Sequence, residues 1–220
     1  GHALMVQRFI GLMSGTSMDA VDAALVGIDA NGRLELEAHY SLPLPDELRH
    51  RLLAISHTDS WSANELANLD IAFSECCVLA VQRLLAGADV SEQQIVAIAS
   101  HGQTVRHKPN LTPAYTCQIG DPTRLAVQTG IDVIYDFRRK DIAAGGQGAP
   151  LVPAFHQQVF AQSDASIAVI NLGGIANVTW LGPKQQVQGF DTGPANTLLD
   201  QWVQAHYPNQ HYDKDAALAY

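Results

Sequence analysis

The sequence predicts an α/β fold in which a mixed sheet carries helices on its faces. Three patterns support this prediction: strand-like apolar runs at the start of the chain, one long amphipathic helix pattern after them, and short apolar runs that alternate with helical patterns from residue 94 onward. The expected order of elements is βββ, α, β, α, β, α. This order is typical of a sheet that is covered by helices.

The first three strands are expected at residues 8–13, at residues 21–28 and from Leu34. The third alternates apolar and polar residues, as a half-buried strand does. Pro43 and Pro45 should end it, because proline cannot donate to a strand ladder. A short helix is expected next, over residues 45–55.

The strongest helix pattern in the chain covers residues 62–85. Ser62 and Glu65 have the spacing of a capping box. Apolar residues then recur at intervals of three and four, as on the buried face of a helix: Leu66, Leu69, Phe73, Cys76, Cys77, Ala80 and Leu84. The two cysteines lie on this face, so we expect them to pack in the core rather than to bind a metal or react.

The middle of the chain alternates strands with helices. Asp121 is expected to cap a helix that has Pro122 at its first position. The elements expected here are a strand at 94–100, a polar loop at 101–110, a strand at 115–120, a helix at 121–130, a strand at 132–137, and a glycine-rich loop that leads into a helix at 145–161.

The strand pattern restarts near residue 164, which predicts a first domain at residues 5–164 and a second from residue 165 to 220. "SIAVINLGGIANVTWLG" reads as strand, glycine turn and strand, like the opening of the chain. A further strand is expected to end at Asp191. The helix after it has Pro194 near its start and four apolar residues on one face: Leu198, Leu199, Trp202 and Val203.

Composition narrows the class of function. Among 220 residues, 47% are hydrophobic and 16% are charged, which suits a packed core and excludes a disordered chain. The formal net charge of -9 argues against a nucleic-acid partner. We expect no membrane partner, because no apolar run looks long enough to span a bilayer, and the first residues lack a signal-peptide pattern. Three cysteines, an odd number, favour a reducing, cytoplasmic location.

Two turns of small residues are candidates for holding a phosphate. The first offers Gly15, Thr16 and Ser17, and the second offers Gly173, Gly174 and Asn177. Small residues let backbone N–H groups approach an anion. Asp19 and Asp22 follow the first turn closely, which makes sense if a cation lies beside the phosphate. An ordinary hairpin with polar turn residues explains the first turn equally well.

Asp191 is the candidate general base, because carboxylates at strand ends in α/β sheets face the ligand crevice. The alternative is that it only caps the following helix. His101 and Gln103, in the polar stretch after a buried strand, are candidates for contacts with a substrate, although a plain surface loop fits as well. Asp121 and Arg124 would hold a hydroxyl or carboxylate, or merely cap their helix.

Six stretches in this order resemble the anhydro-N-acetylmuramic acid kinase family, from about Phe9 to the end of the chain: "GLMSGTSMDAVD", "SHGQTVRHKP", "QIGDPTRLA", "VIYDFRRKDIAAGGQGAPLVPAFH", "NLGGIANVT" and "GFDTGPANTLLD". The resemblance implies two ribonuclease-H-like lobes of the actin-like ATPase and sugar-kinase superfamily, with ATP between them. It implies that a bacterial enzyme of cell-wall recycling opens 1,6-anhydro-N-acetylmuramic acid with water and transfers the γ-phosphoryl group of ATP to O6.

The resemblance also implies roles for individual residues. Asp191 would activate the water, Asp19 would help to place Mg²⁺, and the glycines of the second turn, Gly173 and Gly174, would line the nucleotide. For such an enzyme, His101, Gln103, Asp121 and Arg124 are the residues nominated above as sugar contacts. The ATP phosphates would be lined by eight consecutive residues of the first turn: Gly15, Thr16, Ser17, Met18, Asp19, Ala20, Val21 and Asp22.

Several alternatives stay open from the sequence. The chain would otherwise be a related kinase or phosphatase for another sugar, or a nucleotide-binding scaffold without catalysis. It departs from the family at Ala20 and Ala195, where glycine is common. The resemblance suggests a homodimer. It also implies that the second lobe is truncated here, before the family's adenosine-binding glycine motif, so that this stretch alone should bind ATP poorly.

Overall fold

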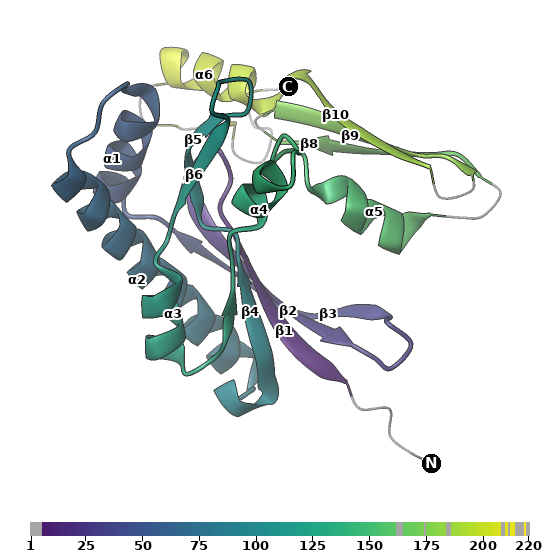
Figure 1. Ribbon diagram of the computed structural model, residues 1–220. Helices are drawn as coiled ribbons and strands as arrows, with labels where there is room; N and C mark the ends of the chain where they lie inside the picture. Colours follow the sequence, from purple (N-terminus) through teal and green to yellow (C-terminus); the bar gives the residue numbers. More distant parts are fainter. Residues whose placement is uncertain are drawn as a thin grey trace. The chain divides into compact units, whose positions relative to one another are not determined.

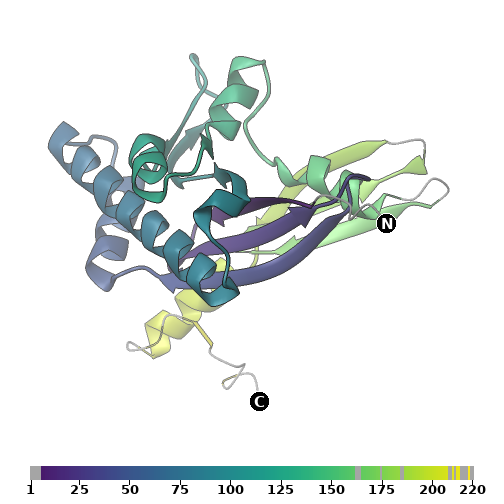
Figure 2. The same cartoon turned by 90° about the horizontal axis from the view of Figure 1, so that it is seen from below.

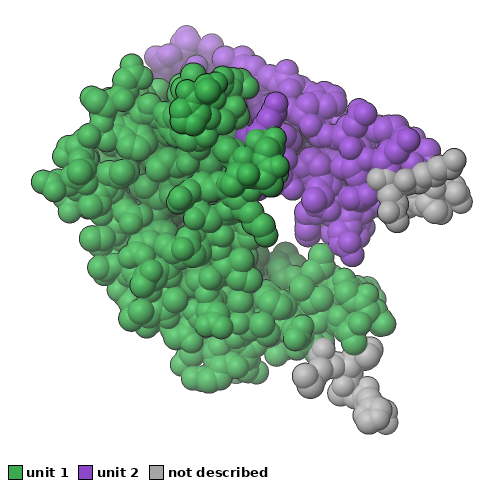
Figure 3. All heavy atoms as spheres, in the orientation of Figure 1, with its two compact units in different colours: residues 1–146 green, residues 147–220 purple. Residues whose placement is uncertain are grey.

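The computed structural model describes residues 6–161, 165–173, 175–183, 186–207, 210, 212–213 and 218. The chain divides into two compact units, residues 1–146 and residues 147–220, which are coloured separately in Figure 3. The predicted boundary near residue 164 falls later than this division. The difference is due to helix α5 (Val152–Phe160), which packs against strands β9 (Ile175–Leu181) and β10 (Val187–Pro194) of the second unit.

The first unit is built on a five-stranded mixed sheet, as the sequence predicts. The strand order is β3 (Leu34–Pro43), β2 (Ala20–Ile28), β1 (Gln7–Met13), β4 (Ile95–Ser100) and β7 (Val133–Ile134). The first three strands in the chain pair antiparallel, whereas β1 pairs parallel with β4 and β4 with β7. This is the βββαβαβ arrangement expected of a ribonuclease-H-like lobe.

Helix α2 (Ala63–Ala88) forms the core of this unit together with the sheet. It contacts β2 and β3 and also helix α3 (Pro122–Thr129), and α1 (Asp46–His57) packs on it (Figures 1 and 2). Leu69 and Phe73 are almost completely buried and belong to the same apolar cluster as Ile10 and Leu25 of the sheet. The apolar faces of the strands and of α2 therefore pack in one core. This shared burial produces the alternating pattern of the strands and the helical spacing of α2 that predicted these elements.

The ends of α2 show how the sequence begins and stops the helix. Ser62 accepts a hydrogen bond from the backbone nitrogen of Glu65 at 3.4 Å, but the Glu65 carboxylate is bound by Arg51 at 2.9 Å instead of closing the box. The capping box is therefore only half formed. At the other end, Asp89 adopts a left-handed conformation with φ 54°. Asparagine and aspartate tolerate that conformation better than most residues.

The described part of the chain contains one helix, α2, that is long and apolar enough to cross a membrane by length and composition. The sequence expectation that no such run exists was therefore too strict. Nine side chains of α2 are buried in the core of the first unit, Cys77 among them. Burial raises the pKa of the Cys77 thiol to about 12 and also raises the pKa of Cys76. All three cysteines are free thiols, and the predicted packing role of the adjacent pair is confirmed.

Residues 101–110 do not form the predicted polar loop. Strand β5 (Gln103–Lys108) pairs antiparallel with β6 (Tyr115–Ile119) in a separate two-stranded ribbon. Gln103 and Val105 are buried, whereas Thr104 is half-buried between them. The alternation of a strand is thus present, but a glutamine fills one of the buried positions, so that hydropathy did not reveal it.

The segment after α3 also differs from the prediction. The strand expected over residues 132–137 is limited to Val133–Ile134 in β7. Asp136 then adopts φ 67°, and the chain enters helix α4 (Phe137–Ala143), which the sequence analysis did not anticipate. A left-handed residue cannot continue the extended backbone of a strand, and Asp136 directly precedes the first residue of α4.

The second unit contains three antiparallel strands in the order β10, β9, β8 (Ile167–Leu172), with α5 against β9 and β10. The two strands predicted within residues 166–182 are confirmed as β8 and β9. Strand β10 does not end at Asp191 but continues to Pro194, and helix α6 (Asn196–His206) follows. Of the four apolar side chains predicted on one face of α6, only Val203 is buried.

Candidate functional site

The turn between β1 and β2 presents its backbone to solvent. Gly15, Thr16 and Ser17 are exposed, whereas Met18 is only 4% exposed and has φ 53°. The backbone nitrogen of Met18 donates to the oxygen of Gly15 at 3.2 Å, which closes the turn. The buried Met18 side chain anchors a loop whose small residues point outward. Such a loop leaves room for an anion to approach the backbone.

Two carboxylates follow this turn. Asp19 is exposed and accepts a hydrogen bond from the Ser17 hydroxyl at 2.6 Å. The Asp22 carboxylate lies 3.6 Å from Nε2 of His39, and both side chains are about half exposed. Carboxylate oxygens are the ligands that Mg²⁺ prefers, and it keeps several waters. Among the described residues, no group of three or more His, Cys, Asp or Glu side chains is arranged to hold a metal ion.

Two of the residues predicted to line ATP, Met18 and Val21, have buried side chains that are 4% and 1% exposed. Only their backbone groups could face a ligand. Ala20, the first residue of β2, is half-buried.

Gln103 lies beneath the turn rather than in a surface pocket. Its side chain is fully buried, and its Nε2 donates to the backbone oxygens of Gly15 and Thr104, each at 3.2 Å. Its Oε1 accepts from the Ser14 hydroxyl at 2.6 Å. Gln103 is predicted to contact the sugar, but its side chain has no exposed surface.

His101 uses both of its ring nitrogens within the first unit. Nδ1 lies 2.7 Å from the backbone oxygen of Gly102, and Nε2 accepts from Nε of Arg138 at 2.7 Å. Burial, more than the nearby Arg138 charge, lowers the pKa of His101, although its bond to Gly102 opposes the shift. The neutral tautomer with hydrogen on Nδ1 satisfies both contacts, because Nε2 must then accept.

Asp121 and Arg124 connect α3 to α2. Asp121 caps α3 by accepting from the backbone nitrogen of Thr123 at 2.9 Å, which confirms the predicted cap. Nη1 of Arg124 lies 2.6 Å from Oε1 of Glu75 on α2. The pKa of Glu75 is lowered by hydrogen bonds from Gln128 and Arg124. Nε of Arg124 is buried and has no hydrogen-bond partner among the described residues, so the contact with Glu75 does not satisfy the whole guanidinium group.

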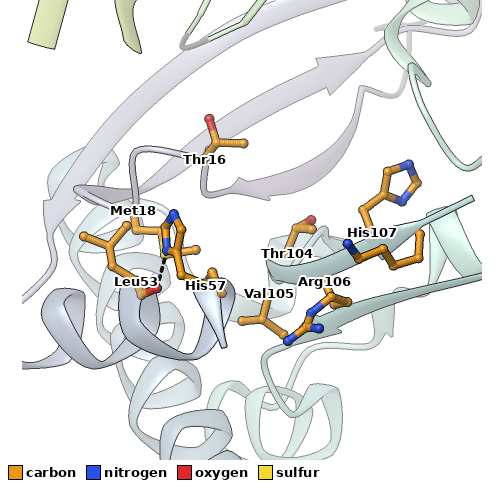
Figure 4. Close-up of a pocket in the computed structure, with 10 residues that line it drawn as sticks. Thr16, Met18, Leu53, His57, Thr104, Val105, Arg106 and His107 are labelled. Atoms are coloured by element: carbon orange, nitrogen blue, oxygen red, sulfur yellow. Dashed lines mark hydrogen bonds between the residues drawn. The ribbon is translucent and has the colours of Figure 1, made fainter. Parts of the chain in front are cut away.

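An open pocket of about 300 Å³ lies beside the turn in the first unit (Figure 4). Thr16 and Met18 of the turn, Thr104 of β5 and His57 of α1 contribute to its wall. Arg106 and His107 leave β5 on opposite sides, as Figure 4 shows. The pocket is rich in nitrogen and hydroxyl groups: its remaining lining residues are Leu53, Ser56, Val105, Arg106, His107 and Lys108.

In the second unit, the structure brings Asp191 close to a glycine turn. Asp191 is exposed on β10 and pairs with Asn177 of β9. The register shifts between Asp191 and Gly193, so the strand bulges at Thr192, whose hydroxyl donates to the oxygen of Ala176 at 3.1 Å. Bulges re-aim side chains and are common beside active sites.

The start of α6 is tied to the same turn. The backbone nitrogen of Asn196 donates to the oxygen of Gly173 at 3.0 Å, and its side chain donates to the oxygen of Leu172 at 2.9 Å. The residue that precedes α6 is Ala195, so Asp191 does not cap the helix. That alternative is excluded. Gly174 lies outside the described residues.

Arg138, which bonds His101, and Thr104, which lines the pocket, were not predicted from the sequence. Both lie within stretches that were quoted for the resemblance, "VIYDFRRKDIAAGGQGAPLVPAFH" and "SHGQTVRHKP". Nothing in the local pattern marks Arg138 as the partner of His101, because the two residues come from different elements.

The match to a family model over residues 7–220 decides the family: the model describes anhydro-N-acetylmuramic acid kinase. The chain belongs to this kinase family. Curated proteins named anhydro-N-acetylmuramic acid kinase agree. The protein from Idiomarina loihiensis is 71% identical, and the match covers 98% of this chain and 58% of the relative's length. The protein from Shewanella amazonensis is 53% identical, and the match covers 96% of this chain and 57% of the relative's length.

The chain therefore spans somewhat more than half the length of these members of the kinase family. A solved structure of a reductive activator for a corrinoid, iron-sulfur protein is similar with a TM-score of 0.45 and 16% identity, covering 86% of this chain and 32% of its own. A likeness this distant carries no information about what the kinase chain binds.

Proposed function

We propose that the full-length protein containing this chain is an ATP-dependent kinase that hydrolytically opens 1,6-anhydro-N-acetylmuramic acid and phosphorylates O6. The proposal rests on membership of the kinase family over residues 7–220. The observation that carries the chemistry is the exposed Asp191 carboxylate at the bulge of β10.

The reaction balances with one base. Asp191 takes a proton from water as the water oxygen bonds to the anomeric carbon, C1. The bond from C1 to O6 breaks, and O6 bonds to the γ-phosphorus of ATP. ADP leaves, and the product is N-acetylmuramic acid 6-phosphate. An exposed carboxylate that is not committed to a helix cap suits this role.

The turn at residues 15–22 would hold the phosphates of ATP through its backbone N–H groups. Thr16 and Ser17 would add hydroxyl donors, whereas Met18 and Val21 would contribute backbone groups only, since their side chains are buried. Gly173 stays a predicted nucleotide contact.

Mg²⁺ would be held by Asp19, with water completing its coordination. The exposure of the Asp19 carboxylate and its hard oxygen donors fit this ion. When bound, Mg²⁺ neutralises charge on the phosphates.

Geometry modifies the proposed sugar contacts. The Gln103 side chain has no exposed surface, so we assign it to the support of the site rather than to direct recognition of the sugar. His101, Asp121 and Arg124 are only partly buried, and we keep them as proposed sugar contacts. We further assign the protein to the bacterial cytoplasm, where ATP is present and free thiols persist. A homodimer, and the absence of nucleic-acid and membrane partners, stay predictions.

The test uses the full-length protein with ATP, Mg²⁺ and the anhydro-sugar, and mass spectrometry to detect the 6-phosphate. Asp191→Asn should lower kcat by a factor of about 100 to 10,000, the usual range for loss of a general base. The Kd for ATP should change less than about twofold, because the carboxylate acts only in the chemical step.

Asp89→Asn is the matched control. It removes the same charge from an exposed aspartate at the end of α2, and asparagine accepts the left-handed conformation found there. Normal turnover by Asp191→Asn would refute the base assignment. ATP binding without turnover of any sugar by the wild type would favour a scaffold, and turnover of another sugar would favour a related kinase.

A further inference from the structure

The buried amide of Gln103 is bonded on every side by protein atoms. It is the first residue of β5, and its side chain has no exposed surface. Nε2 faces two carbonyl oxygens, those of Gly15 and Thr104. These partners set the orientation of the amide, because Oε1 in that place would meet only acceptors.

Ser14 completes the link on the other side of the turn. Its side chain is 2% exposed, and its Oγ lies 2.6 Å from Oε1 of Gln103 and 3.0 Å from the backbone oxygen of Ala20. The Ser14–Gln103 pair therefore contacts the N-terminal side of the turn at Gly15 and its C-terminal side at Ala20. One buried pair joins both sides.

This arrangement restrains a loop that is otherwise open. Gly15, Thr16 and Ser17 are exposed, and a side chain added at Gly15 would meet nothing within 4 Å. A buried donor or acceptor without a partner is costly, so the turn conformation that satisfies Gln103 and Ser14 is strongly favoured over others.

The same glutamine connects the turn to the neighbouring pocket. Thr104 follows Gln103 in β5 and lines the pocket together with Thr16 of the turn. A shift of the turn relative to β5 would break the bonds of Gln103 and move one wall of that pocket.

We propose that Gln103 and Ser14 are positioning residues that hold the turn at residues 15–20 in the shape that binds the phosphates of ATP. This inference rests on the proposed kinase function. In this proposal neither side chain touches the nucleotide. Gln103 acts through the backbone oxygen of Gly15, and Ser14 shares its single hydroxyl hydrogen between Oε1 of Gln103 and the backbone oxygen of Ala20.

The experiment compares Ser14→Ala, Gln103→Met and the double variant in the full-length protein. The Kd for Mg·ATP, measured by calorimetry, should rise about three- to tenfold in each single variant, the effect of losing one or two net hydrogen bonds. The KM for the sugar should change less than about twofold. The double variant should weaken ATP binding by less than the product of the single effects, because the residues act as one unit.

Thr179→Val is the control for a purely structural loss. Thr179 is 1% exposed and bonds Nδ1 of His156 at 2.9 Å within the second unit, so that the variant also removes a buried hydrogen bond. Its melting temperature should fall as in Ser14→Ala, while its Kd for Mg·ATP stays unchanged. Equal losses of ATP affinity in Thr179→Val and Ser14→Ala would overturn the inference.

Two further outcomes separate this inference from the function. If the wild type forms the 6-phosphate but Ser14→Ala and Gln103→Met bind Mg·ATP normally, the positioning role is wrong and the kinase function stands. If the wild type forms no product yet the variants lose ATP affinity as expected, the sugar chemistry is wrong and the positioning role stands.

Discussion

His101 is a residue whose protonation state the fold controls. Its ring is partly buried, Nε2 accepts from Arg138, and Nδ1 lies against the oxygen of Gly102. Protonation of Nε2 would remove the acceptor and place a second positive charge beside the guanidinium. This is consistent with the lowered pKa of His101, for which burial is the main cause.

The lowered pKa predicts a pH dependence of stability. In the unfolded chain, His101 takes up a proton as the pH falls through about 6.5, while the folded chain stays neutral until its own lower pKa. The free energy of unfolding should therefore fall below pH 6.5. His101→Gln, which offers one donor and one acceptor and does not titrate, should make the urea midpoint less dependent on pH between about 7.5 and 5. His50→Gln, at an exposed position, is the control, and an unchanged slope in His101→Gln would contradict this account.

Among the elements, α2 contributes most to the core of the first unit. The two faces of α2 differ in side-chain exposure: Leu69 is fully buried, whereas Ile71, two residues later, is 41% exposed. The difference follows from the helical period, which turns neighbouring positions to different faces.

Leu69→Ala should therefore lower the free energy of unfolding by about 2–5 kcal/mol, the usual cost of a cavity in a packed core. Ile71→Ala on the same helix should cost less than about 1 kcal/mol, because its side chain is largely accessible to water. Urea denaturation, monitored by circular dichroism, measures the free energy of unfolding of both variants. Similar losses in the two variants would mean that α2 does not pack as described.

At the scale of the whole molecule, the hydrophobic core belongs almost entirely to the first unit. Among the described residues, the buried apolar cluster lies within residues 1–146, and the buried apolar side chains of the second unit are Leu181 and Val203. Leu198, Leu199 and Trp202 of α6 are each more than half exposed.

A polypeptide of residues 1–146 should consequently unfold in one cooperative urea transition, since burial of apolar surface is the main favourable contribution to folding. A polypeptide of residues 147–220 should show no such transition. Far-UV circular dichroism of the two polypeptides makes the comparison. A cooperative unfolding transition in the isolated polypeptide of residues 147–220 would contradict the assignment of the core to the first unit.

Hydrophobic periodicity, prolines and helix-capping residues were sufficient to predict much of the secondary structure. The apolar alternation before Pro43, the helical spacing between Leu66 and Leu84, and the cap at Asp121 are local signals, so that residues close in sequence were enough to read them. The six quoted sequence stretches were also enough to indicate the family, which the match over residues 7–220 confirms.

Contacts between distant segments could not be read in this way. The ribbon of β5 and β6, the burial of Gln103 under the turn and the bond between His101 and Arg138 each join residues from separate elements. Gln103 looks like a surface residue because it is polar, and it is buried only because Ser14 and Gly15 satisfy its amide. A buried polar group is stable only with its partners, and the folded chain alone brings those partners together.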